Sequence, residues 1–301
     1  MSAPVRGVFC AAATPVDAAG APDVALFQAH CRRLLDDGCD GIALLGTTGE
    51  ANSFSGAERR TILEAALACG IAPDRLMPGT GCPAIPDTVE LTRHALSLGV
   101  ERVVMLPPYY YKGVSTEGLY AAYSEVIERV GDSRLRIVLY HIPQMSGIAI
   151  APELIGRLIA AYPQTVVGIK DSAGEFDNMR ALVAAFPGFS VLAGADPLLL
   201  PLLQAGGAGC ITATSNLVAR DLRTVFDGYA DPEKKAAVEA AQQRIVAYRT
   251  LSNSFGAQIA TIKAMIGIRA GAPQWANVRP PLMPLDAGQR QRLATEMTAL
   301  E

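Results

Sequence analysis

The sequence predicts an α/β fold, a parallel (β/α)8 TIM barrel, and three observations predict it. Short apolar segments alternate with longer segments whose apolar residues recur at helical spacing. This alternation indicates a parallel sheet, and strands that are apolar on both faces are typical of a sheet covered by helices. Eight such units in about 230 residues fit a closed barrel. A doubly wound open sheet is the alternative, and it is less favoured because no Gly-x-Gly-x-x-Gly motif follows the first strand.

The expected strands are short runs rich in Val, Ile, Leu and Ala. In chain order they lie at 7–13, 41–45, 75–79, 102–106, 136–140, 166–170, 189–194 and 208–212. The first connecting helix is expected over 23–36, because its apolar residues keep helical spacing and Gly38 ends it. The third is expected to open with Asp87 and Glu90, which have the spacing of a capping box. The helix after the eighth strand is expected from about Ala219.

These units divide the chain into two expected parts. Residues 1–230 form the barrel, which we expect to be the catalytic domain. Residues 231–301 form a C-terminal helical extension, interrupted by Pro280-Pro281.

The composition excludes several classes of protein. The chain has 301 residues, of which 50% are apolar, and a net charge of -3 with no basic stripe, so a nucleic-acid partner is not expected. No apolar run approaches the length of a membrane helix, and the N-terminus does not resemble a signal peptide. Six cysteines without a CxxC pair and three scattered histidines predict a cytoplasmic protein with buried thiols and no metal site.

Lys170 is the sharpest functional signal, because it ends an apolar strand where barrel enzymes carry their chemistry. An apolar barrel mouth favours the neutral amine, which can attack a carbonyl and form a Schiff base. A lysine that reaches solvent from a strand end is the alternative. Tyr140 ends the preceding strand at the same depth and could move protons beside Lys170, or it could simply pack in the interior.

Other strand ends carry further candidates. The turn Gly46-Thr47-Thr48-Gly49 offers backbone N–H groups and two hydroxyls to a carboxylate, although it also reads as an ordinary glycine turn. Asp196-Pro197 reads either as a helix N-cap followed by proline or as a contact to a substrate hydroxyl.

Four motifs together carry a family resemblance: GTTGE at 46–50, PPYY at 107–110, YHIP at 140–143 and GIKD at 168–171. With these motifs in this order, the chain resembles the dihydrodipicolinate synthase / N-acetylneuraminate lyase family over residues 7–285. The resemblance implies a class I aldolase-type lyase that works on pyruvate or another 2-oxo acid and an aldehyde. It implies no metal or organic cofactor, and a homotetramer built as a dimer of dimers.

The resemblance also implies roles for individual residues. Lys170 matches the Schiff-base lysine and Tyr140 the phenol that relays protons. Thr47 matches the link between Tyr140 and a second tyrosine, here Tyr110, which reaches into a neighbouring subunit's site. Thr48 matches the residue that holds the pyruvate carboxylate.

Further positions would contact the substrate. Gly46 belongs to the same turn as Thr48, and Ile211 matches a position whose backbone carbonyl faces the site. Gly194, Asp196 and Ser146 match positions near the second part of the substrate, with Asp196 and Ser146 as candidate hydroxyl contacts.

Some residues of this chain differ from the family's motifs, and these differences limit the substrates that we expect it to take. Synthases have an arginine for the aldehyde's carboxylate where this chain has Met145, which cannot form a bidentate ion pair. Sialic acid lyases have a glutamate and a serine where this chain has Pro197 and Ala213, and His141 replaces an asparagine common to both groups.

We therefore expect a lyase that cleaves, forms or dehydrates a 2-keto-3-deoxy sugar acid or a 4-hydroxy-2-oxo acid. The alternative is 4-hydroxy-tetrahydrodipicolinate synthase, which condenses pyruvate with aspartate semialdehyde. A non-catalytic paralogue that binds a keto acid is the alternative outside enzymes, and a phosphate-handling barrel isomerase is disfavoured because no glycine-rich phosphate loop precedes a short helix.

Overall fold

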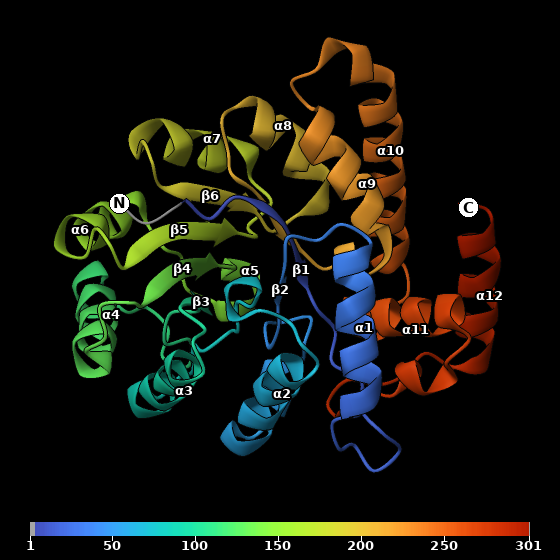
Figure 1. Cartoon of the computed structure of the whole chain (residues 1–301), viewed down its shortest axis with the longest axis horizontal. Helices are drawn as coiled ribbons and strands as arrows, with labels where there is room; N and C mark the ends of the chain where they lie inside the picture. Colours follow the sequence, from blue (N-terminus) through green and yellow to red (C-terminus); the bar gives the residue numbers. More distant parts are fainter. Residues whose placement is uncertain (1–3, 301) are drawn as a thin grey trace.

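The computed structural model describes residues 4–300, and its centre is a seven-stranded parallel sheet that curls into a nearly closed barrel (Figure 1). The spatial order is β2-β1-β7-β6-β5-β4-β3, and every neighbouring pair is parallel. The strands are β1 (Gly7–Ala11), β2 (Gly41–Ala43), β3 (Arg102–Met105), β4 (Arg136–His141), β5 (Val166–Asp171), β6 (Ser190–Ala193) and β7 (Gly209–Thr212). The predicted barrel is confirmed.

The predicted third strand at 75–79 is wrong in detail, because this segment is not a regular strand. It nevertheless closes the gap between β2 and β3: Met77 N–H donates to Ile42 C=O at 2.9 Å, and Val104 N–H donates to Pro78 C=O at 3.0 Å. Pro78 has no N–H of its own, so the ladder is reduced to isolated bridges. The segment therefore fills the eighth position of the barrel.

Helices follow the strands and cover the outside of the barrel, as Figure 1 shows. They are α1 (Val24–Asp36), α2 (Gly56–Ala68), α3 (Ile85–Ser97), α4 (Thr116–Val130), α6 (Pro152–Ala161), α7 (Phe176–Ala185), α8 (Leu199–Gln204) and α9 (Ser215–Gly228). The short helix α5 (Pro143–Ser146), which follows β4, lies inside this ring of helices (Figure 1).

The expected start of one helix is wrong. Helix α3 begins at Ile85, after the N-cap Ala84, so Asp87 and Glu90 form no capping box; Pro86, with its fixed φ, occupies the first turn instead. Helix α9 runs from Ser215 but is kinked at Val218, so the regular helix beyond the kink begins at about Ala219, as expected.

The strand side chains divide into two packed layers, which is what alternation along a strand predicts. Tyr140, Leu192 and Ile211 belong to an inner cluster within the barrel. Val191 and Cys210, one residue away on β6 and β7, belong to the larger cluster between barrel and helices. Side chains that belong to the inner layer and lie at the ends of the strands therefore face the mouth of the barrel.

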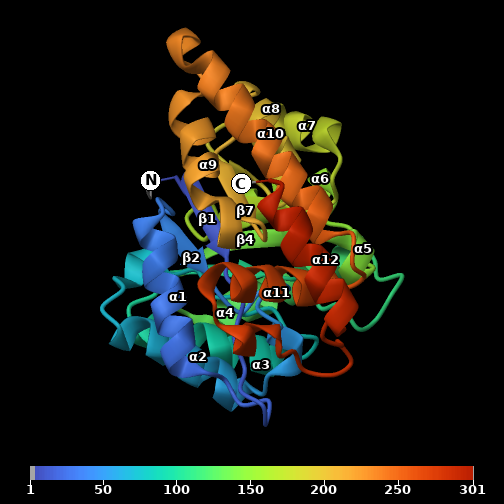
Figure 2. The ribbon, with the colours of Figure 1, turned by 90° about the vertical axis from the view of Figure 1, so that its right-hand side faces the viewer.

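Three more helices, α10 (Lys235–Ser252), α11 (Gln258–Ala270) and α12 (Ala287–Thr298), lie together against one side of the barrel (Figure 2). Helix α10 packs along α9, and Trp275, which follows α11, is buried. The division of the chain at residue 230 stays a prediction. No helix within residues 4–300 is long and apolar enough to cross a membrane.

Candidate active site

Lys170 and Tyr140 lie side by side at the ends of β5 and β4. They are register partners in the parallel ladder, and both side chains are buried. The Lys170 Nζ lies 4.1 Å from the centroid of the Tyr140 ring. The expectation that these residues share one depth in the barrel is therefore confirmed by their register. A buried lysine held against a phenol places an amine and a proton carrier within one small volume.

Thr47 joins this pair from the turn that follows β2. Its Oγ1 lies 3.1 Å from the Tyr140 hydroxyl, a hydrogen bond in which either group can donate. Three elements distant in the chain, β2, β4 and β5, thus bring Thr47, Tyr140 and Lys170 into one chain of contacts. The hydrogen bond between Thr47 and Tyr140 can pass a proton between the phenol and the turn, while the Lys170 amine lies over the tyrosine ring.

The turn has an uncommon backbone. Leu45 and Glu50, which flank it, have φ values of 57° and 53°, a left-handed backbone conformation that residues other than glycine rarely adopt. Each such residue costs roughly 1–3 kcal/mol and persists only where the surroundings hold it. Gly49 is required here, because a Cβ would lie 2.9 Å from Ala12 C=O. Strained residues of this kind cluster at functional sites, so the turn is a candidate for one.

The shape of the turn leaves donors available. Within residues 4–300, the backbone N–H groups of Thr47 and Thr48 donate to no backbone carbonyl or side chain. Gly46, Thr47 and Tyr140 line a narrow pocket that also reaches Asn52. Unused N–H groups beside a hydroxyl form a site suited to a carboxylate.

Ile211 and Gly194 lie on neighbouring strand ends of the same barrel. Ile211 is fully buried in the inner cluster that contains Tyr140. Gly194 N–H donates to Asp171 C=O at 2.7 Å, and a Cβ at Gly194 would lie 1.9 Å from Ser172 Oγ. Glycine is therefore needed at this position for the close approach of two chain segments.

Asp196 and Ser146 are less suited to the roles expected of them. The Asp196 carboxylate is buried, lies 3.3 Å from Arg249 of α10, and caps no helix; it is itself the first residue of a short 3-10 helix. The N-cap interpretation is thus wrong, because the side chain is directed to α10. The single O–H of Ser146 has the backbone carbonyls of Ile142 and Ile148 within hydrogen-bond distance, and its oxygen accepts from Ile148 N–H at 3.1 Å, which leaves little capacity for a substrate. Contact with a substrate hydroxyl stays a prediction for both.

Tyr110 does not join the site within this chain. Its side chain is 72% exposed and packs edge-to-face against Tyr111, with ring centroids 5.4 Å apart. Tyr109 lies nearer the pocket than Tyr110 does along the chain of contacts, since its hydroxyl donates at 2.8 Å to Oδ1 of Asn52, which lines the pocket. Burial raises the pKa of Tyr109 above its usual value. An exposed Tyr110 fits the expectation that it acts in another subunit's site, which stays a prediction.

Two residues beside the lysine and tyrosine were given no role by the sequence. His141 Nδ1 accepts from Ile150 N–H at 3.0 Å, and burial lowers the pKa of this imidazole. Asp171 is buried and accepts from Asn178 at 2.6 Å and from Ala173 N–H at 2.9 Å. Both fix the strand ends next to Tyr140 and Lys170; their position directly after these residues was the available signal.

A second pair missed by the sequence reasoning is Glu50 and Lys263. Their side chains are fully buried, with Glu50 Oε1 2.5 Å from Lys263 Nζ. The signal was present in each case: Glu50 ends the GTTGE motif, and Lys263 stands alone in the apolar run of α11.

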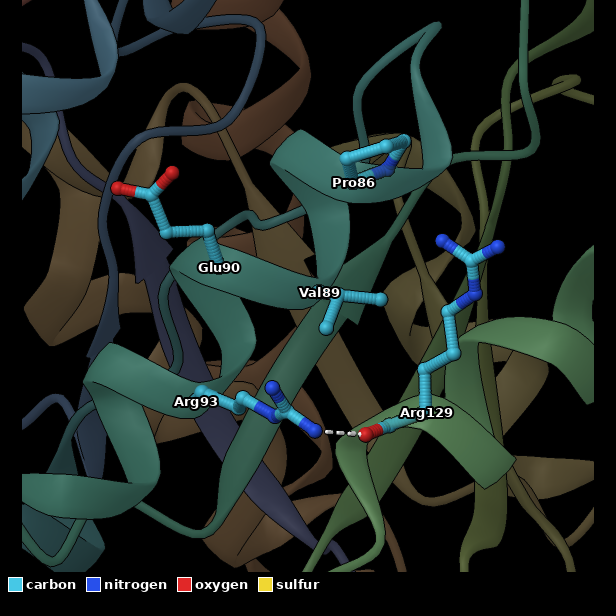
Figure 3. Close-up of a pocket in the computed structure, with 5 residues that line it drawn as sticks. All are labelled: Pro86, Val89, Glu90, Arg93 and Arg129. Carbon is cyan, nitrogen blue, oxygen red and sulfur yellow. Dashed lines mark hydrogen bonds between the residues drawn. The ribbon is translucent and has the colours of Figure 1, made fainter.

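A separate hollow lies between α3 and α4, on the outer helix layer (Figure 3). The side chains of Pro86, Val89 and Arg93 line it, and Arg93 donates to the backbone carbonyl of Arg129. None of the predicted site residues lies there, so it is not the active-site candidate. Among the described residues, no group of three or more His, Cys, Asp or Glu side chains could hold a metal ion.

Known proteins match this chain over nearly its whole length. The model of the dihydrodipicolinate synthetase family matches residues 4–300. An uncharacterized DapA-like lyase of Chloroflexus aurantiacus is 35% identical over 93% of this chain and 92% of its own length. A 4-hydroxy-tetrahydrodipicolinate synthase of Synechococcus sp. (strain WH7803) is 30% identical over 99% of this chain and 96% of its own.

Two solved structures share the fold over nearly the whole chain. The dihydrodipicolinate synthase of Agrobacterium tumefaciens superposes with a TM-score of 0.88 and 32% identity, covering 97% of this chain and 99% of that one. YagE of E. coli K12, a prophage protein of the dihydrodipicolinic acid synthase family solved with pyruvate, has a TM-score of 0.90, 27% identity and 99% coverage of both chains. The chain therefore belongs to the dihydrodipicolinate synthetase family of lyases.

Proposed function

We propose that Lys170 forms a Schiff base with pyruvate or another 2-oxo acid. The observation that carries the proposal is the contact chain Lys170–Tyr140–Thr47, in which a buried amine lies 4.1 Å from the tyrosine ring. The relative solved with pyruvate supports the choice of ligand.

The reaction follows from these groups. The neutral amine of Lys170 adds to the ketone carbon, and the ketone oxygen takes up protons and leaves as water, which yields an iminium ion. Tyr140, supplied through Thr47, delivers and removes these protons. In the condensing direction the carbon next to the iminium loses a proton to Tyr140, and the resulting enamine adds to the aldehyde. In the cleaving direction the C–C bond breaks to give the same enamine, which takes up a proton before water releases the 2-oxo acid from Lys170.

The turn holds the substrate in position for this chemistry. The free N–H groups of Thr47 and Thr48, with the Thr48 hydroxyl, receive the carboxylate, while Gly46 leaves open space beside them. Ile211 and Gly194 complete the wall on the opposite strands. Fixing the carboxylate orients the ketone toward Lys170.

For the second part of the substrate we propose a 2-keto-3-deoxy sugar acid or a 4-hydroxy-2-oxo acid. Met145 supports this choice: it occupies the position of the carboxylate-binding arginine in synthases, and its side chain is 64% exposed. A thioether offers no ion pair to a second carboxylate. Synthase activity remains the second candidate, because relatives at 30% identity carry that name.

We also propose a homotetramer, a dimer of dimers, in which Tyr110 completes a neighbouring site. Its exposure next to the exposed Tyr111 supports this. We place the protein in the cytoplasm, which fits the six free cysteines.

The test is to incubate the protein with pyruvate, add borohydride and measure the intact mass, with Lys170→Ala as the control variant. A pyruvyl adduct in the parent alone supports the proposal. No adduct in either protein contradicts it and favours a non-catalytic paralogue. A panel of 2-keto-3-deoxy acids, 4-hydroxy-2-oxo acids and aspartate semialdehyde then separates the two substrate candidates.

A further inference from the structure

The buried ion pair between Glu50 and Lys263 links the active-site turn to the C-terminal helices. Lys263 lies in α11, 213 residues beyond Glu50, and both side chains are fully buried. The second carboxylate oxygen of Glu50 accepts from Arg279 N–H at 3.0 Å, so both oxygens are engaged by the C-terminal part of the chain. Burial lowers the pKa of Lys263, while the carboxylate of Glu50 opposes this shift.

This pair meets the turn at one of its two strained positions. Glu50 has a φ of 53°, and its N–H donates to Thr47 C=O at 3.0 Å. The conformation of Glu50 is therefore coupled directly to Thr47, whose hydroxyl bonds Tyr140. The other end of the turn is held by the barrel, since a Cβ at Gly79 would lie 2.2 Å from Leu45 C=O.

We propose that Glu50 and Lys263 are positioning residues that hold the turn in its carboxylate-binding shape. The proposal rests on the proposed function, because it assigns the turn to the carboxylate of a 2-oxo acid. Among the described residues, neither side chain forms a hydrogen bond or ion pair with Lys170 or Tyr140, so the pair acts through Thr47 and Thr48. Helix α11 is then part of the binding machinery, although it contributes no reacting group.

The test separates positioning from simple stabilisation. A variant with one charge removed retains the other charge in the interior, whereas Glu50→Gln with Lys263→Met removes both and keeps an acceptor for Arg279 N–H. In this double variant we expect the pyruvate concentration for half-maximal borohydride trapping to rise about tenfold or more, because the carboxylate site is misplaced. The limiting extent of trapping should match the parent, because Lys170 is intact. Hydrogen exchange of residues 44–52 should be faster.

Two further variants serve as controls for this test. Asp221→Asn removes an ion pair with Arg244 far along the chain from the turn, and should leave half-saturation unchanged. If the double variant does not fold, Glu50→Gln alone replaces it, because a buried Lys263 without its partner can lose its proton. In this single variant we expect a smaller rise in the pyruvate concentration for half-maximal trapping. Parental half-saturation and exchange in a folded variant would overturn the positioning proposal alone. Absence of trapping in the parent would instead overturn the proposed function, and this proposal with it.

Discussion

The two sides of the barrel mouth are built in different ways. On the β4–β5 side, Tyr140 and Lys170 are presented by regular strands in direct register. On the β2 side, Thr47 and Thr48 lie in a turn with two strained residues, held by a buried ion pair to a helix from the far end of the chain. The comparison teaches that the groups we propose to react are placed by strand register, whereas the turn that we propose orients the substrate is held by a remote polar tether, the Glu50–Lys263 ion pair.

The largest expected effect lies on the strand side. Tyr140→Phe removes the hydroxyl that meets Thr47 and keeps the ring beside Lys170. We expect turnover to fall by about 10²–10⁴-fold, because proton transfer by a positioned side chain contributes that much. Steady-state rates on the substrate identified by the panel measure this. Turnover within a few-fold of the parent would show that Tyr140 is only a packing residue.

On the tether side, the largest effect is on stability. Lys263→Met leaves the Glu50 carboxylate buried without its partner, which costs about 3–5 kcal/mol. Urea unfolding at neutral pH measures the loss. Adding Glu50→Gln to this variant should restore most of the stability. An unchanged unfolding free energy in Lys263→Met would mean that the carboxylate finds another partner.

A second long-range polar contact, between His30 and Asn216, predicts that the free energy of unfolding depends on pH. His30 is buried, its Nε2 lies 2.8 Å from Asn216 Oδ1, and burial lowers its pKa to about 3. In the unfolded chain this imidazole binds a proton near pH 6.5, whereas in the folded chain it stays neutral down to about pH 3. The free energy of unfolding therefore falls as the pH falls from about 6.5 toward 3. Between pH 7 and 5 the parent should lose about 2 kcal/mol more than His30→Gln. Equal losses in both proteins would contradict the buried neutral imidazole.

The smallest effect is expected for an exposed ion pair. Arg180 and Asp177 of α7 lie 3.0 Å apart, with side chains 64% and 86% exposed. Arg180→Ala should change the unfolding free energy by about 0.5 kcal/mol or less, because solvent and salt screen exposed charges. This variant is the surface counterpart of Lys263→Met. A loss as large as that of Lys263→Met would mean that burial does not decide the strength of these tethers.

The strand ends could be predicted from the sequence, whereas the long-range contacts of the turn could not. Strand periodicity and position placed Lys170 and Tyr140 together, because register in a parallel sheet follows from regular local structure. The sequence also predicted that Thr47 lies near them, through the family resemblance. The third strand was predicted in the right place, at 75–79, but its irregularity was not, because the effect of Pro78 on the ladder was not taken into account.

The tethers could not be predicted in this way. Glu50 and Lys263 are 213 residues apart, and no local pattern pairs them. Asp196 followed by Pro197 has the local pattern of a helix cap, but the tertiary contact with Arg249 determines where its carboxylate points. Long-range polar contacts of this kind depend on how the C-terminal helices pack, which periodicity does not encode.

The most direct test of the account is to locate the reduced pyruvate adduct by peptide mapping with tandem mass spectrometry. The chain offers other lysines, at 112, 234, 235 and 263, as internal controls. The account predicts an adduct on the peptide that contains Lys170 and on no other. An adduct on Lys112 or Lys263 with Lys170 unmodified, or no adduct at any lysine, would contradict it.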